Sequence, residues 1–116
     1  MVRVKRVYES ASKDDGFRIL VDRLWPRGLT KQRAHVDLWM KEIAPSDAVR
    51  KWFGHDPERW TEFVKRFRTE LATKKDQLAE LKRLERQHHT ITLLFGAKDE
   101  EHNQAVALAS LLKRKR

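Results

Sequence analysis

"TITLLF" (Thr90–Phe95) is the stretch of this sequence that decides the fold. Every residue in it is β-branched or apolar, and a short run of this kind is typical of a strand buried on both faces, as in a sheet covered by helices. Gly96 then interrupts the run. Together with the segments described next, it predicts the α/β class: a small single-domain sheet of three to four strands covered by about four to five helices.

Two further strands are expected near the N-terminus. The segment "VRVKRVY" (Val2–Tyr8) alternates valine with basic residues at first, and "FRILVDRL" begins a second strand at Phe17. The segment "ESASKDDG" between them is rich in turn-forming residues and short for a helical crossover. This favours antiparallel neighbours, with a tight parallel connection as the alternative. Alternation in "HVDLWM" (His35–Met40) predicts a short strand or an extended edge, and a helix is the competing interpretation.

Capping residues indicate where several helices begin and end. Thr30 is in position to cap a short turn, "TKQRA", and Ser46 to cap the segment "DAVRKWF", which Gly54 can end. Asp56, followed by Pro57, predicts the start of a longer helix, because proline is favoured at the first helical position.

Three longer segments carry apolar residues at helical spacing. The first stripe comprises Trp60, Phe63, Val64, Phe67 and Leu71. A second segment, roughly Lys75 to Gln87, repeats leucine at positions 78, 81 and 84. A last helix is expected from about Glu100, with Asp99 as its N-cap. Its inner stripe comprises Ala105, Leu108, Ala109 and Leu112.

The composition favours one soluble domain spanning residues 1–116. Cysteine is absent, which excludes disulfides and thiolate catalysis. No apolar run approaches the roughly 18 residues of a membrane span, and the N-terminus lacks the apolar block of a signal peptide. We therefore expect a cytoplasmic protein. The five histidines have no metal-ligand spacing, so we expect neither a metal nor a cofactor.

The chain is strongly basic. Its formal net charge is +9, from 26 Lys and Arg against 17 Asp and Glu, which makes an anionic partner a legitimate expectation. Four of the positive charges belong to the tail Lys113–Arg116. This tail is expected to complete the last helix, whose C-terminus favours cations.

Two loops are the best candidates for a functional site. Ligands of open α/β sheets tend to bind beyond the carboxyl ends of strands, where loops and helix N-termini meet. One such loop, "DRLWPRG", follows Val21, and another, "AKDEEHN", follows Gly96. The first supplies Asp22, Arg23, Trp25, Pro26, Arg27 and Gly28. The second supplies Lys98, Asp99, Glu101, His102 and Asn103.

These residue types point to an anionic small molecule that carries phosphate or carboxylate. Arginine forks and a lysine before a helix N-terminus grip such groups, which assigns this role to Arg23, Arg27 and Lys98. Asp22 and His102 are the candidates for proton transfer if the two strands are parallel neighbours, and the site is then enzymatic. The remaining candidate ligand-binding residues are Trp25 for stacking, Gly28 for close backbone approach, and Asp99 and Asn103 at the helix start.

Structural roles explain the same residues differently. Asp22 can pair with a nearby arginine, Trp25 can fill the core, and Pro26 and Gly28 can simply form the turn. Asp99 and Asn103 can act only as helix caps. His55, beside Asp56, is a further histidine within reach of the site.

Two other functions compete with a small-molecule site. The first is nucleic-acid binding by the basic outer faces of the helices. The residues concerned are Arg59, Lys65, Arg66, Arg68, Lys74, Lys75, Lys82, Arg83 and Arg86. The second is a protein interaction module, for which the expected sign is Trp25 or Trp39 exposed within an apolar patch. The sequence contains neither a recognisable helix-turn-helix nor a glycine-rich nucleotide loop.

The motifs "VDRLWPRG" and "AKDEEHN", with "VKRVY" and the segment "DLWMKEIAPSDAVRKWFGHDPERWTEF", resemble the YeaO-like family of small bacterial proteins. The resemblance covers nearly the whole chain. It implies a compact α/β domain in a bacterial cytoplasm, and it passes on no substrate or reaction, because the family is a domain of unknown function. The motif positions coincide with the two loops. Phe95 stands where tyrosine is expected in many relatives, which argues against a catalytic phenol at this position.

Overall fold

Four parallel strands form a single sheet with the order β1-β4-β2-β3. The computed structural model describes residues 1–114. The strands are β1 (Val2–Arg6), β2 (Phe17–Leu20), β3 (Leu38–Trp39) and β4 (Ile91–Phe95). The predicted fold class is confirmed.

β4 lies between the first two strands. Val2 of β1 is in register with Ile91, and Phe17 of β2 is in register with the same residue from the other side. The expectation that β1 and β2 are antiparallel neighbours is therefore wrong. All five residues of β4 are buried, and a strand with no polar face is best placed in the middle of the sheet, with a hydrogen-bonded neighbour on each side.

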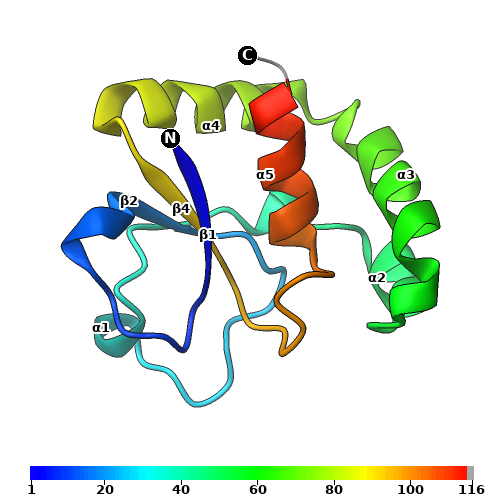
Figure 1. Ribbon diagram of the computed structural model, residues 1–116, viewed down its shortest axis with the longest axis horizontal. Coiled ribbons are helices and arrows are strands. Elements are labelled where there is room, and N and C mark those ends of the chain that lie inside the picture. The colour runs from blue at the N-terminus through cyan, green and yellow to red at the C-terminus, as the bar shows by residue number, and fades with distance from the viewer. Residues whose placement is uncertain (115–116) are drawn as a thin grey trace.

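Helices are interspersed with the strands along the chain (Figure 1). They are α1 (Lys31–Ala34), α2 (Asp47–Phe53), α3 (Trp60–Leu71), α4 (Lys75–His88) and α5 (Gln104–Arg114). The order along the chain is β1, β2, α1, β3, α2, α3, α4, β4 and α5. Three short 3-10 turns lie in the connections: η1 (Lys13–Asp15) between β1 and β2, η2 (Lys41–Ile43) before α2, and η3 (Pro57–Arg59) before α3. In Figure 1, β4 starts beside one end of α4 and runs away from it, so the loop that follows β4 lies at the end of the sheet far from α4.

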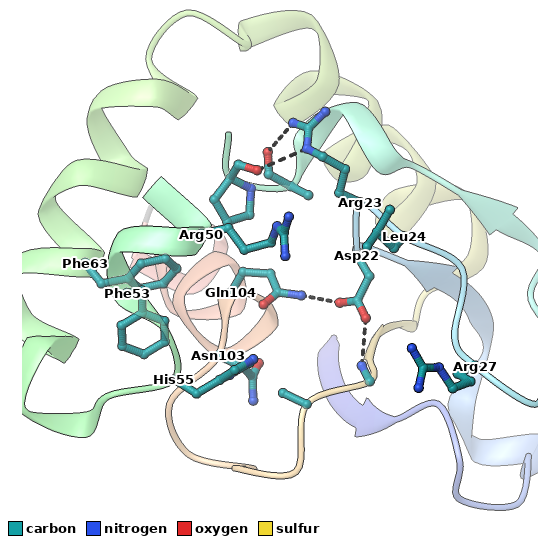
Figure 2. Close-up of a pocket in the computed structure, with 14 residues that line it drawn as sticks. Asp22, Arg23, Leu24, Arg27, Arg50, Phe53, His55, Phe63, Asn103 and Gln104 are labelled. Atoms are coloured by element: carbon teal, nitrogen blue, oxygen red, sulfur yellow. Dashed lines mark hydrogen bonds between the residues drawn. The ribbon is translucent and has the colours of Figure 1, made fainter. Parts of the chain in front are cut away.

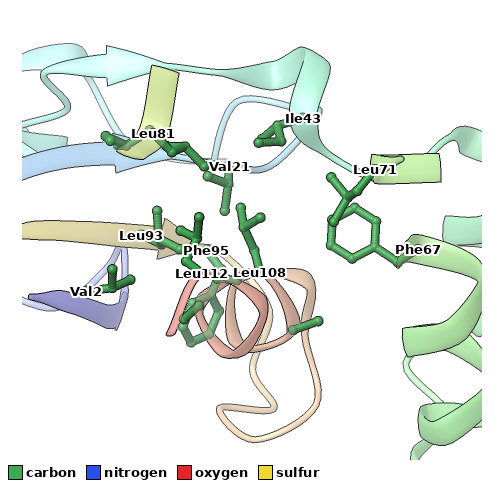
Figure 3. Packing of buried hydrophobic residues seen from close by; sticks show 14 of the residues in the cluster. Val2, Val21, Ile43, Phe67, Leu71, Leu81, Leu93, Phe95, Leu108 and Leu112 are labelled. Atoms are coloured by element: carbon green, nitrogen blue, oxygen red, sulfur yellow. The ribbon is translucent and has the colours of Figure 1, made fainter. Parts of the chain in front are cut away.

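The main hydrophobic core covers one face of the sheet. Alternate residues of β4, Ile91, Leu93 and Phe95, face this core, which the predicted stripes of α3, α4 and α5 complete. Figure 3 shows Leu93 and Phe95 against Leu108 and Leu112 of α5. The apolar residues that share a helix stripe, and the alternate residues of β4, therefore face this core as the sequence predicts.

The second face of the sheet is covered by loops and by α1. Leu20 and Leu94 pack there against Val7 and Ala34 in a smaller apolar cluster. Three polar residues are buried beside this smaller cluster. Arg18 forms an ion pair with Asp15, and the Thr92 hydroxyl donates a hydrogen bond to the Asp15 carbonyl. Burial alone would raise the pKa of Asp15. Hydrogen bonds from the Ser12 backbone, Lys5 and Arg18 outweigh it and hold this pKa below its ordinary value.

Most of the predicted helix ends are confirmed. The side chains of Thr30, Ser46 and Asp56 each accept a hydrogen bond from a backbone N–H at the start of their helical segments, and Gly54 ends α2 in the left-handed conformation. The expectation for α5 is wrong, because this helix begins at Gln104 rather than near Glu100.

Asn103, not Asp99, is at the start of α5. The Asn103 Oδ1 atom accepts a hydrogen bond from the Val106 N–H at 3.0 Å, as an N-cap does. Of the basic tail, Lys115 and Arg116 lie outside the described residues. Within residues 1–114, none of the helices has the length and apolar character needed to cross a membrane.

Candidate functional site

The loops that follow β2 and β4 leave the sheet side by side. The two strands are parallel neighbours, and the Val21 N–H continues their ladder by donating to the Leu94 carbonyl at 3.1 Å. One step further, the Gly96 N–H donates to Oδ2 of Asp22 at 2.9 Å. The chain then continues from β2 towards β3, but from β4 towards α5, which packs on β1 and β4. Such a divergence opens a crevice at the carboxyl ends of parallel strands.

A pocket of about 510 Å³ lies in this crevice (Figure 2). The loop after β2, the chain after β4, and the α2–α3 region all contribute side chains to its wall. The lining residues are Asp22, Arg23, Leu24, Arg27, Ala44, Pro45, Arg50, Phe53, His55, Phe63, Gly96, Ala97, Asn103 and Gln104.

Asp22 is the acidic group of this pocket. Its Oδ2 atom accepts the Gly96 N–H, and its Oδ1 atom accepts a hydrogen bond from the Gln104 side-chain amide. Burial raises the pKa of Asp22 to about 6, although these two hydrogen bonds and the nearby His55 act in the opposite direction. Asp22 forms no ion pair with any residue in the described part of the chain.

Three arginines line the pocket, and their environments differ. Arg23 donates from Nε to the Pro45 carbonyl and from a terminal nitrogen to the Ala44 carbonyl, both at 3.2 Å, and so ties the segment before α2 to the end of β2. Arg50 pairs with Asp47 at 3.2 Å on an exposed helix face. The exposed Arg27 side chain has no hydrogen-bond or ion-pair partner among residues 1–114.

The predicted residues of the second loop lie in a compact turn before α5. Asp99 accepts hydrogen bonds from the backbone N–H groups of Glu101 and His102, which hold its pKa below the ordinary value together with the His102 ring. The His102 Nδ1 atom lies 2.9 Å from Oδ2 of Asp99, and its ring packs edge-on against Trp60. Asn103 reaches the pocket, whereas Lys98, Asp99 and His102 are not among the residues that line it.

Two predicted residues of the first loop also lie away from the pocket wall. The Trp25 indole donates to the Leu29 carbonyl at 2.7 Å and packs against Trp39, next to the smaller apolar cluster. Gly28 has a positive φ of 83°, which suits a turn. Trp39 is itself 36% exposed and donates to the Asp22 carbonyl, so it borders the same loop from the edge strand β3.

Arg50 and Gln104 were not among the candidates that sequence reasoning singled out. Arg50 is one turn before the end of α2, where a basic residue is common for reasons of helix stability alone. Gln104 directly follows the "AKDEEHN" motif, and its nearness to that motif was the available signal. His55, the further histidine expected within reach of the site, lines the pocket and has a positive φ of 58°.

The basic outer faces of the helices are partly neutralised by their own acidic neighbours. Arg66 pairs with Glu62 at 3.2 Å, and its guanidinium lies 4.1 Å from the centre of the Trp52 ring. Arg59 lies near the same ring, and Lys74 donates to the Ala44 carbonyl. Within residues 1–114, no cluster of three His, Cys, Asp or Glu side chains is arranged to hold a metal ion.

Comparison with known proteins identifies uncharacterised relatives. A family model described as the inactive DUF488-N3 subclade matches residues 1–116. An uncharacterised protein of Mycobacterium tuberculosis is 42% identical over 111 residues, which cover 96% of this chain and 92% of that protein. The uncharacterised protein YeaO of Escherichia coli is 39% identical over 112 residues, which cover 97% of this chain and 96% of YeaO. No solved structure matches the chain.

Proposed function

The chain belongs to the YeaO-like family of uncharacterised bacterial proteins, the inactive DUF488-N3 subclade, and on this premise we propose that it binds an anionic small molecule in the pocket between the β2 and β4 loops. The anionic group is a phosphate or a carboxylate. Arg27 binds it directly, Arg50 adds a second positive charge to the pocket, and Arg23 holds the wall of the pocket in place.

The Arg27 side chain, which has unused hydrogen-bond donors at the pocket, is the main support for this proposal. It lines a pocket with two other arginines and has no hydrogen-bond or ion-pair partner in the described residues, so its five N–H donors are available to a ligand. Arg50 also lines the pocket, and its exposed pair with Asp47 contributes little to stability. The apolar side chains of Phe53 and Leu24 complete the wall.

The proposed function is to bind the ligand and not to catalyse its conversion. Acid–base catalysis needs two proton-transfer groups that reach one reacting molecule, and the sequence suggested Asp22 and His102 for these two roles. The His102 ring instead contacts Asp99 and Trp60, outside the pocket lining. The description of the matching subclade as inactive agrees with a binding role.

Isothermal titration calorimetry with inorganic phosphate tests this function. The wild-type protein should bind phosphate saturably, and Arg27→Ala should weaken binding by roughly 10-fold or more, because one charge-assisted hydrogen-bonding group contributes about 1.5–3 kcal/mol. Arg33→Ala is the matched control. Arg33 is an exposed residue of α1 outside the pocket lining, so this variant has the same change in net charge and should bind as the wild type does.

Two results would refute the proposal. One is the absence of saturable binding by the wild type. The other is an equal loss of affinity in the Arg27→Ala and Arg33→Ala variants, which would mean that phosphate responds to the overall field of the protein and not to this pocket. Amide NMR spectra recorded during the titration add an independent readout, since the Gly96 and Gln104 resonances should shift first.

A further inference from the structure

The Asp22 carboxylate is half-buried and forms no ion pair within the described residues. It lines the same pocket as the three arginines, yet no Lys, Arg or His nitrogen in the described residues comes within ion-pair distance of it. Charges that are withdrawn from water are normally paired in proteins. Figure 2 shows the carboxylate between Gln104 and the backbone of the β4 loop, with Arg27 and Arg50 on opposite sides of it.

The two hydrogen bonds that Asp22 accepts leave part of its capacity unused. Gly96 and Gln104 each donate one neutral N–H to a different oxygen. A carboxylate offers about four acceptor positions, so roughly two remain, and the pocket is the space next to them. A neutral hydroxyl group could fill one of these positions, but only a cation would also offset the negative charge.

The arginines are better placed to bind a ligand than to neutralise Asp22. Arg23 uses its Nε and one terminal nitrogen on the carbonyl groups of residues 44 and 45. Arg50 is paired with Asp47. The pocket thus presents guanidinium groups and a separate carboxylate to the same space of about 510 Å³.

We propose that the ligand of this pocket is a zwitterion, with its anionic group bound by Arg27 and its ammonium group bound by Asp22. This inference rests on the anion-binding function proposed above and makes Asp22 the residue that determines specificity. An amino acid or an amino-phosphate compound has the required chemistry. The apolar atoms of Phe53 and Leu24 leave room for a short hydrocarbon part between or beside the two charged groups.

A pair of matched probes tests the inference. O-phosphoethanolamine and ethyl phosphate have the same anionic group, and only the first has an ammonium group. At pH 8 the wild-type protein should bind O-phosphoethanolamine at least about 10-fold more tightly, as expected for one additional charge-assisted hydrogen bond. The net charge of +9 acts against this result, because a general field favours the more negative ethyl phosphate. A preference for the zwitterion would therefore come from a local contact.

Asp22→Asn should abolish the preference. The asparagine side chain has the same shape and no charge, so O-phosphoethanolamine should lose its advantage, while ethyl phosphate binds at least as tightly as before. Asp14→Asn is the matched control, since Asp14 is exposed and outside the pocket lining, and it should retain the wild-type preference. The same comparison with β-alanine and propionate distinguishes a carboxylate ligand from a phosphate ligand.

The outcomes separate the two proposals. If ethyl phosphate binds the wild type as tightly as O-phosphoethanolamine, and β-alanine binds no better than propionate, the anion site stands and the zwitterion inference is wrong. If none of the four compounds and no inorganic phosphate binds, the anion-binding function itself fails. A preference that persists in Asp22→Asn would also overturn the assignment of the ammonium group to Asp22. The wild-type comparison needs no variant, so the inference can be tested even if Asp22→Asn folds poorly.

Discussion

The effect of Asp22→Asn on the free energy of unfolding should depend on pH. Relative to the wild type, the variant should become more stable as the pH rises from acidic to neutral and alkaline values. Burial raises the pKa of Asp22 from 3.8 to about 6 in the folded state. Between these two values the folded protein holds a proton that the unfolded chain has released. The stability that this carboxyl contributes is therefore fully present below about pH 3.8 and is lost as the pH rises through about 6.

The magnitude follows from the size of the shift. A difference of one pKa unit corresponds to about 1.4 kcal/mol, so a rise from 3.8 to about 6 corresponds to about 3 kcal/mol at most. About one fifth of this is already lost at pH 4, which leaves about 2 kcal/mol between pH 4 and pH 8. Asparagine can keep one oxygen on the Gly96 N–H, and the Gln104 amide can rotate to accept from the new NH₂ group.

Urea denaturation at a series of pH values measures this effect. The quantity to plot is the free energy of unfolding of Asp22→Asn minus that of the wild type, because this difference cancels the titration of all other groups. It should rise by about 2 kcal/mol between pH 4 and pH 8, while the same plot for Asp14→Asn should rise much less. Phosphate-free buffers are needed, since a bound anion would add to stability. A flat plot would refute the argument, and a falling one would mean that Asp22 is ion-paired in solution.

Two further substitutions test the local structure around the sheet and the site. Gly16→Ala should destabilise the fold by about 3 kcal/mol or more in urea denaturation, because a Cβ atom on Gly16 would lie 2.2 Å from the Thr90 carbonyl oxygen at a φ of +63°. Gly28→Ala is its control, with a φ of +83° and no atom within 4 Å of the new Cβ, and should cost only about 1–2 kcal/mol. Asn103→Ala should lower the free energy of unfolding by about 2 kcal/mol, since it removes the cap of α5 and a half-buried hydrogen bond to the Asp99 carbonyl. A loss for Asn103→Ala no greater than that for an exposed residue such as Ser110 would show that α5 does not depend on this cap.

Local signals account for the elements that sequence reasoning predicted correctly. The start of α2 depends on a hydrogen bond from the Val49 N–H to the Ser46 side chain, three residues away. The stripe of α3 and the apolar run of β4 are likewise patterns of neighbouring residues, and burial follows from them directly. The start of α5 was mistaken because Asp99 and Asn103 both have the chemistry of a cap, and both accept backbone hydrogen bonds within the same turn.

The sequence by itself determined the α/β class, the helix caps at Thr30, Ser46 and Asp56, the core stripes and the two loops that carry the polar motifs. Only the tertiary structure decided that β4 lies between β1 and β2, and that Arg50 and Gln104 join Asp22 at one pocket. The two hydrogen bonds on the Asp22 carboxylate come from residues 74 and 82 positions away along the chain. Burial and charge at this site are set by contacts between distant segments, and such contacts depend on how the whole chain packs rather than on any local pattern.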